Sequence, residues 1–191
     1  MTVTQDWRSR KRDETHQRIY ETAMRLFQEH GFDQVSVAQI AAEAGVSVPT
    51  FYAHFPSKEY IVFLPVPTVE QFIPLIRMVP ADLPVAERIR KMTPLWFAQI
   101  PPGERQQVLA RWRMVATTPA LRIRAAEFER TTAEAVIDAL SATDERPLTG
   151  ADRVVARAYL AAFTSAFLTW ADTNGERRLE DIVEEAFQAL R

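Results

Sequence analysis

Residues 45–59, GVSVPTFYAHFPSKE, carry hydrogen-bonding side chains at close spacing directly after a glycine. These side chains are Thr50, Tyr52 and His54. Phe51 and Phe55 lie four residues apart, so they share one face of a helix, which we expect to point into a core. The polar side chains then lie on or near the outer face. Hydroxyl and imidazole groups in that position suit phosphates or the edges of nucleic-acid bases.

Small and basic residues surround this polar row. Val48, Pro49 and Ala53 are small enough for the backbone to approach bases, and they can touch a thymine methyl group. Lys58, just beyond the helix, suits a phosphate. A basic cluster near the N-terminus is expected either to follow the DNA backbone or minor groove, or to be a solvated tail. It consists of Arg8, Arg10, Lys11 and Arg12.

Three short helices must hold these side chains in place. The inner face of the first helix is marked at helical spacing by Ile19, Ala23, Leu26 and Phe27. Ser36 is placed to cap the second helix, with binding of a phosphate as an alternative role, and Gly45 ends that helix. Ser47 caps the third, with Pro49 in its first turn, where a missing N–H costs nothing. This order predicts a helix-turn-helix, in which the last helix lies in the DNA major groove.

The composition narrows the range of functions. The chain has 191 residues and a formal net charge of −2, so binding of nucleic acid must depend on a local arrangement of side chains rather than on bulk charge. It contains no cysteine, which excludes disulfides, thiolate nucleophiles and cysteine-bound zinc. We find no apolar run of about 20 residues and no hydrophobic secretory segment in MTVTQDWRSRKRDE. We therefore expect a soluble, cytoplasmic protein without a cofactor, a metal or a membrane partner.

The second part of the chain also has helical spacing throughout. Prolines are expected to divide its beginning into short pieces, at Pro65, Pro67, Pro74, Pro80 and Pro84. Residues 150–170 are apolar nearly all round, which predicts a helix buried on several sides. The expected fold is all-α, with a helix-turn-helix domain and basic arm at residues 1–58 and a helical bundle at residues 59–191.

The run LFQEHGFDQVSVAQIAAEAGVSVPTFYAHFPSKEYI resembles the DNA-binding domain of the TetR family of bacterial transcriptional regulators. The resemblance covers residues 16–64. It implies that the matching residues face DNA, namely Val48, Pro49, Thr50, Tyr52, Ala53, His54 and Lys58, with Ser36 and Ser47 at the helix starts. It also implies a homodimer held by the two terminal helices, which match residues 151–173 and 177–190. Ala162 and Phe187 are expected within that packing.

The bundle is rich in large aromatic side chains. They are candidates for lining a cavity for a small hydrophobic effector, with ordinary core packing as the alternative for each: Phe72, Trp96, Trp112, Phe128, Phe163, Phe167 and Trp170. The PPGER turn and the TTPALR helix start resemble a TetR branch with an acyl-CoA-like ligand-binding domain, to which the mycofactocin regulator belongs. The resemblance implies an acyl-CoA effector whose phosphates would meet nearby arginines. These are Arg105, Arg111, Arg113, Arg122 and Arg124, with a solvated face as the alternative.

One feature departs from the TetR pattern. Pro65 and Pro67 must end or kink the fourth helix soon after Phe63, so we expect a short helix and then a second piece carrying Phe72 and Ile76. The expected function is a ligand-responsive repressor that binds a palindromic operator as a homodimer. The alternatives are a helical small-molecule-binding protein or an enzyme that uses the apolar pocket, and a protein that only dimerises. The enzyme alternative is weak because His16, His30 and His54 all lie in the first domain.

Overall fold

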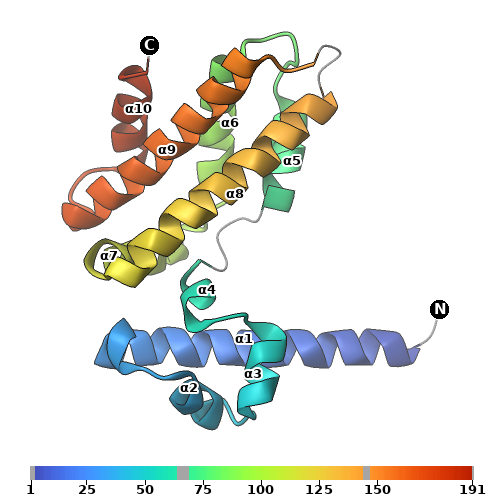
Figure 1. Cartoon of the computed structure of the whole chain (residues 1–191), viewed down its shortest axis with the longest axis vertical. Coiled ribbons are helices and arrows are strands. Elements are labelled where there is room, and N and C mark those ends of the chain that lie inside the picture. The colour runs from blue at the N-terminus through green and yellow to red at the C-terminus, as the bar shows by residue number, and fades with distance from the viewer. Residues whose placement is uncertain (1–2, 64–68, 144–146, 191) are drawn as a thin grey trace. The chain divides into compact units, whose positions relative to one another are not determined.

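The computed structural model describes residues 3–63, 69–143 and 147–190 (Figure 1). All regular elements within these ranges are helices, which confirms the predicted all-α fold. The chain divides into two compact units, Met1–Leu64 and Pro65–Arg191.

The first unit contains the predicted helix-turn-helix. Its elements are α1 (Val3–His30), the 3-10 turn η1 (Phe32–Gln34), α2 (Val37–Glu43), α3 (Val48–His54) and α4 (Lys58–Val62). The four residues predicted to form the inner face of α1 are all buried, together with Ile40, Phe51 and Phe55. This core fixes the orientation of α3, because both of its phenylalanines are fully buried in it.

Local sequence signals decide where these helices begin and end. Ser36 and Gln39 form a reciprocal capping box at the start of α2, and Ser47 accepts a hydrogen bond from the Thr50 N–H at the start of α3. Gly45 in the turn has a φ of 65°, a conformation that glycine adopts without a steric penalty. Arg18 of α1 donates from Nε to the carbonyl of Ala44 over 2.9 Å, which ties the end of α2 to α1.

The second unit is a bundle built around one central helix. It contains α5 (Val69–Met78), α6 (Val85–Phe97), the turn η2 (Pro102–Glu104), α7 (Arg105–Thr117), α8 (Pro119–Thr143), α9 (Gly150–Asp172) and α10 (Leu179–Gln188). α9 packs against α6, α7, α8 and α10. Among the described residues it is the one helix long and apolar enough to cross a membrane by length and composition. Its place at the centre of the bundle accounts for that composition.

The predicted interruption after Phe63 is confirmed. α4 ends at Val62 and α5 begins at Val69, while Pro65 and Pro67 lie outside the described residues. The expected domain boundary after residue 58 falls after the first residue of α4, whereas the structure groups all of α4 with the first unit, where its Ile61 and Val62 are buried. Pro74 was expected to break the chain, and this was wrong: it lies inside α5, where a proline removes only one helical hydrogen bond.

Gly175, in the turn between α9 and α10, is expected to tolerate a side chain poorly. Its φ is 74°, and a Cβ atom built there would lie 2.6 Å from Cδ2 of Leu109 on α7. We expect Gly175→Ala to lower the free energy of unfolding by about 2–4 kcal/mol, from the left-handed backbone and the overpacking together. Chemical denaturation measures this loss. The control is Gly103→Ala, because a Cβ there meets nothing within 4 Å. Equal stability of the two variants would contradict the prediction.

Candidate nucleic-acid interface

The outer face of α3 presents the residues that the sequence predicted. Phe51 and Phe55 are fully buried, whereas Tyr52 is 53% exposed and Val48, Pro49 and Ala53 are also exposed. The edge of the Tyr52 ring packs against Phe51, with the ring centroids 5.4 Å apart, and this contact supports the half-exposed ring. The side chains of Thr50 and His54 are partly buried at the two ends of this face. α3 therefore offers a polar and small-residue surface to solvent.

The hydroxyl groups at the start of α3 are coupled to each other. Oγ of Ser47 and Oγ1 of Thr50 lie 2.8 Å apart, and the Thr50 N–H donates to Oγ of Ser47 over 3.2 Å. Only one of two hydroxyls donates within such a pair, so the other keeps its proton for an external acceptor. Ser47 and Thr50 together can thus offer one O–H to a phosphate without loss of the helix cap.

Ser36 and Lys58 are more committed to the fold than the sequence suggested. Oγ of Ser36 donates to Oε1 of Gln39 over 3.0 Å, so its proton is used by the capping box. Nζ of Lys58 donates to the carbonyls of Phe32 and Val35 over 2.8 and 2.9 Å and lies over the Phe32 ring. A lysine ammonium has three donors, so Lys58 keeps one for a phosphate. Their roles in DNA binding stay predictions.

An open hollow of about 410 Å³ lies beside α3 and the start of α2. It brings together Ser36, Tyr52 and Lys58, three residues from separate parts of the sequence, with Ser57 beside them. Asp33 and Glu59 also line it and make it less favourable to an anion than its basic residue alone would. The hollow is lined mainly by polar side chains and lies next to the exposed face of α3.

His54 stands at the C-terminal end of α3 and contacts α1. Burial, reinforced by the nearby charge of Arg12, lowers the pKa of His54 below its ordinary value. Its ring lies 5.8 Å from the ring of His16, a residue that sequence reasoning did not select as part of the site. His16 is separated from α3 by more than 30 residues in sequence, so only the tertiary fold brings the two histidines together.

In the second unit, most of the predicted effector-binding aromatics form one continuous cluster. Ring centroids lie 5.2 Å apart for Trp96 and Phe163, 4.8 Å for Trp112 and Phe167, and 6.2 Å for Phe167 and Trp170. The cavity beside Trp96 and Phe163 holds only about 20 Å³, against about 300–1,000 Å³ for typical ligand sites. In this conformation these aromatics are a packed core. Phe128 is partly buried, and the side chain of Phe72 lies outside the described part of the chain.

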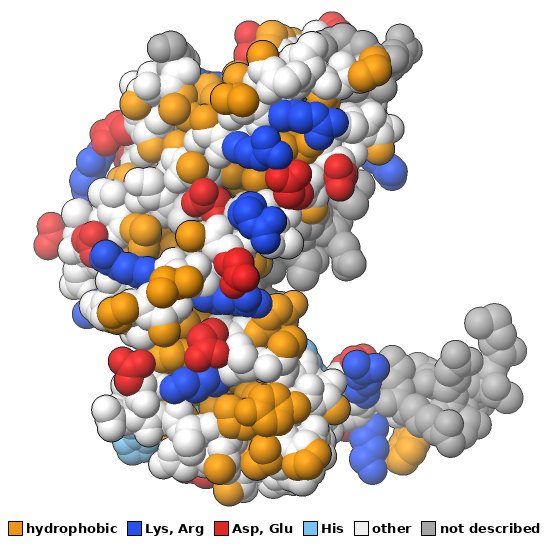
Figure 2. Space-filling view, viewed as in Figure 1, with side chains coloured by type: hydrophobic (Ala, Val, Ile, Leu, Met, Phe, Trp, Pro, Cys, Tyr) orange, Lys and Arg blue, Asp and Glu red, His pale blue; other side chains and the backbone are white. Residues whose placement is uncertain are grey.

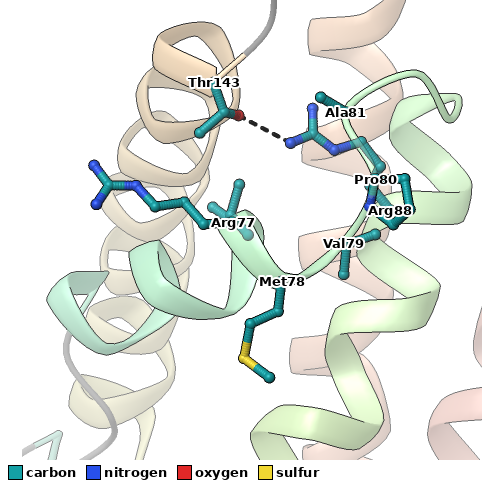
Figure 3. A pocket seen from close by; sticks show the side chains of 8 residues that line it. Arg77, Met78, Val79, Pro80, Ala81, Arg88 and Thr143 are labelled. Atoms are coloured by element: carbon teal, nitrogen blue, oxygen red, sulfur yellow. Dashed lines mark hydrogen bonds between the residues drawn. The ribbon is translucent and has the colours of Figure 1, made fainter.

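A larger hollow, of about 490 Å³, opens where the end of α5 meets α6 and α8. Figure 3 shows the Arg88 guanidinium reaching across it toward α8, where it donates to Oγ1 of Thr143 over 2.9 Å. Arg77 and Met78 point away from that hydrogen bond. Arg88 is buried, so it fastens α6 to the end of α8 at one wall of the hollow.

The five arginines considered for an acyl-CoA differ in their surroundings. Arg105 pairs with Glu180, Arg124 with Glu127 over 2.5 Å, and Arg122 donates to the carbonyl of Ala116. Figure 2 shows acidic and basic side chains interleaved over one face of this unit. The alternative of a solvated, charge-paired face therefore describes Arg105 and Arg124, and Arg113 is also exposed. Arg111 differs, because its side chain is buried.

The surface that α9 and α10 expose does not include Phe187, which was expected in the packing between protomers. Phe187 of α10 is only 1% exposed and packs against Tyr159, with the ring centroids 4.8 Å apart. It therefore belongs to the core of its own protomer, and its placement between protomers was wrong. Ala162 also packs against that core. The exposed face of α9 instead carries Val154, which is 64% exposed, and the small residues Ala161, Ser165 and Thr169.

A helix-turn-helix with an outward polar recognition helix, followed by a helical bundle, defines the class of helix-turn-helix transcriptional regulators. Residues 19–63 match the model of the bacterial regulatory proteins of the tetR family, and residues 83–191 match the MftR C-terminal domain. The chain belongs to the TetR family, with a C-terminal domain of the MftR type. Its relatives are transcriptional regulators rather than enzymes.

Curated relatives match parts of the chain. The regulator TcmR of Streptomyces glaucescens is 28% identical over 120 residues, which are 60% of this chain and 53% of TcmR. EthR of Mycolicibacterium smegmatis is 44% identical over 50 residues, 26% of this chain and 23% of EthR. The chain thus spans about half or less of the length of these curated relatives.

Solved structures show the same fold over nearly the whole chain. The fatty acid degradation regulator FadR from Bacillus halodurans matches with a TM-score of 0.56 and 20% identity, over 92% of this chain and 94% of that one. FadR from Thermus thermophilus, a repressor in complex with lauroyl-CoA, matches with a TM-score of 0.52 and 21% identity, over 92% of both chains. At such identities the likeness concerns the fold alone.

Proposed function

We propose that the chain is a homodimeric repressor that binds a palindromic DNA operator and is released by a small hydrophobic effector. The single observation that carries the DNA-binding part is the outer face of α3, where Tyr52 and its polar and small neighbours are exposed over a buried Phe51 and Phe55. Regulators of the TetR family are in general soluble cytoplasmic proteins, and we propose the same location for this chain.

In the proposed complex each protomer places α3 in a major groove. Two such helices about one DNA turn apart, ~34 Å, read the two halves of a palindrome. Ser47, Thr50, Tyr52, His54 and Lys58 bind phosphates, with Ser36 held as a cap beside them. Val48, Pro49 and Ala53 lie nearest the bases. The second copy docks on α9 and α10, and the exposed α9 face with Val154, Ala161, Ser165 and Thr169 supports this arrangement, while Arg157 on that face is paired with Glu134.

An acyl-CoA is the proposed effector. The MftR-type domain and the acyl-CoA bound to the Thermus thermophilus FadR support this class of molecule. The acyl chain would enter among Trp96, Trp112 and Phe163, with Phe72, Phe128, Phe167 and Trp170 as the further proposed lining residues. Because the present cavity is about 20 Å³, entry requires these rings to move apart, which links ligand binding to a change of the bundle. By linkage, an effector that weakens DNA binding is itself bound more weakly by the DNA complex.

Replacing Tyr52 by phenylalanine tests the DNA-binding role. The ring and its packing on Phe51 remain and only an exposed hydroxyl is lost, so fold and dimerisation should not change. Loss of one phosphate hydrogen bond per protomer, at about 1 kcal/mol each, should weaken operator binding roughly 10- to 50-fold. Gel shifts with the promoter of the protein's own gene measure this, with thermal unfolding as the control for folding.

Two outcomes of these gel shifts would count against the proposal. Equal affinity of the wild type and Tyr52→Phe would remove the proposed role of that hydroxyl. If the wild type gave no specific, salt-sensitive shift on its own or neighbouring promoters, the repressor function would fail. The alternative of a ligand-binding protein without DNA would then stand.

A further inference from the structure

Side chains of α1 lie beside the C-terminal end of α3. The imidazole of His16 stacks on Phe55 with a centroid separation of 4.2 Å and lies 5.8 Å from the ring of His54. Arg12, one turn earlier on α1, is close enough for its charge to act on both histidines. Figure 1 shows α1 continuing past the other helices of its unit toward the N-terminus.

Arg12 and the two histidines lie together at this corner, and Asp13 partly offsets their charge. The charged and titratable groups that act on His16 are His54 from α3 and Arg12 and Asp13 from α1. α4 also packs on α1, but its ionisable residues Lys58, Glu59 and Tyr60 do not contribute to that balance. Positive charge on a histidine next to Arg12 would be repulsive, and a bound anion would relieve that repulsion.

We propose that Arg12, His16 and His54 form a phosphate-binding corner that makes α1 a DNA-contacting element and couples DNA binding to the uptake of a proton by His16. The inference rests on the proposed function for its ligand, a phosphate of duplex DNA, and it adds His16 of α1 to the interface and gives Arg12 a defined place in it. α3 ends at His54. The corner therefore extends the polar surface of α3 toward the DNA backbone beside the groove in which α3 is proposed to lie.

The buried ring nitrogen of His54 decides which histidine takes the proton. Nδ1 of His54 is buried and has no hydrogen-bond partner among the described residues. Protonation of His54 would place an N–H at that atom without an acceptor, which is costly. His54 therefore stays neutral and donates to a phosphate from Nε2, while His16 takes up the charge.

The direction of the pH effect follows from linkage. Burial is the largest cause that lowers the pKa of His16 in the free protein, and positive charge on His54 would lower it further, so the free protein favours the neutral ring of His16. A bound phosphate raises that pKa again, and the complex then holds more protons than the free protein. DNA affinity should therefore rise as the pH falls through the pKa of the complex. It should level off below the pKa of the free protein.

Fluorescence anisotropy with a labelled 30-base-pair duplex of random sequence tests the coupling at constant low salt. A phosphate corner does not depend on sequence, so this probe remains informative even if the promoter-specific function fails. We expect wild-type affinity to rise at least about fivefold from pH 8 to pH 6, within the limit of about tenfold per pH unit for one proton. His16→Gln should lose most of this rise, whatever its affinity at pH 8.

His30→Gln is the matched control, because His30 is exposed at the other end of α1 next to Glu29 and should leave the rise intact. A pH-independent wild type, or a His16→Gln variant with an unchanged rise, would overturn the proposal. A rise that disappears only in His54→Gln would also overturn it, because the proton would then be on the other ring. Circular dichroism of each variant confirms that the helices are formed.

Arg12→Ala provides a second measurement that does not depend on the stacking of His16 in the core. Arg12 is exposed, so its removal should leave folding unchanged and lower the slope of log affinity against log salt by about 0.9 per protomer. Lys91→Ala, which removes an exposed positive charge from α6, is the control and should leave the slope unchanged. Equal slopes for Arg12→Ala and the wild type would contradict a phosphate contact by this arginine.

Discussion

The Phe187→Asp variant is expected to lose the folded structure of the second unit. Phe187 is almost completely buried between α9 and α10 and packs on Tyr159, so the substitution removes a large apolar side chain and places a carboxylate in its position. Loss of the ring alone costs about 3–5 kcal/mol, and burial of an unpaired charge adds to this. The sum approaches the whole stability of a domain, which is about 5–15 kcal/mol.

Val154→Asp is the matched control for this prediction. Val154 is exposed on α9, so an aspartate there should leave the protomer folded. If the second copy docks on this face, Val154→Asp should shift the molecule toward monomer in sedimentation experiments. A folded Phe187→Asp protein by circular dichroism would contradict the core role of the ring. A Val154→Asp protein that remains fully dimeric would place the interface elsewhere.

The Trp96→Ala variant should lose about 3–5 kcal/mol of unfolding free energy. Trp96 is 2% exposed, and its ring contacts Phe97, Phe163 and Phe167 at the centre of the aromatic cluster. Removal of the indole leaves a cavity that the surrounding rings can fill only in part. Chemical denaturation followed by far-ultraviolet circular dichroism gives the loss directly.

Trp7→Ala is the control, because Trp7 is 56% exposed on α1 and its substitution should change stability by less than about 0.5 kcal/mol. Titration with lauroyl-CoA then tests whether the aromatic cluster only forms the core or also lines the site of the acyl chain. If the acyl chain binds among these rings, the ligand should raise the melting temperature of the wild type and should do so differently for Trp96→Ala. The same ligand-induced shift in both proteins would place the acyl chain away from Trp96.

A large part of the fold follows from local signals in the sequence. The caps Ser36 and Ser47, the glycine turn at Gly45 and the spacing of Phe51 and Phe55 determine the helix-turn-helix and the outward face of α3. These signals act over a few residues, through hydrogen bonds and steric limits that any context preserves. For the same reason the proline-rich segment after Phe63 predicted the break between α4 and α5.

Tertiary packing decided what the local patterns left open. Periodicity showed that Phe187 lies on an apolar helix face, but not that this face packs inside its own protomer rather than on a second one. Lys58 looked like a free cation in the sequence, yet the fold brings the carbonyls of Phe32 and Val35 to its ammonium group. The aromatic residues indicated a core or a cavity, and only their packing showed that little space remains.

The sequence by itself therefore determined the class of the protein, the helix-turn-helix and the residues on the outer face of α3. Only the tertiary structure brought His16 and Arg12 of α1 to His54, and only it separated the exposed α9 face from the buried side of α10. The physical reason is the range of the interactions. Caps, turns and helical periodicity act between neighbours in the chain, whereas burial and charge depend on all residues that folding brings close together.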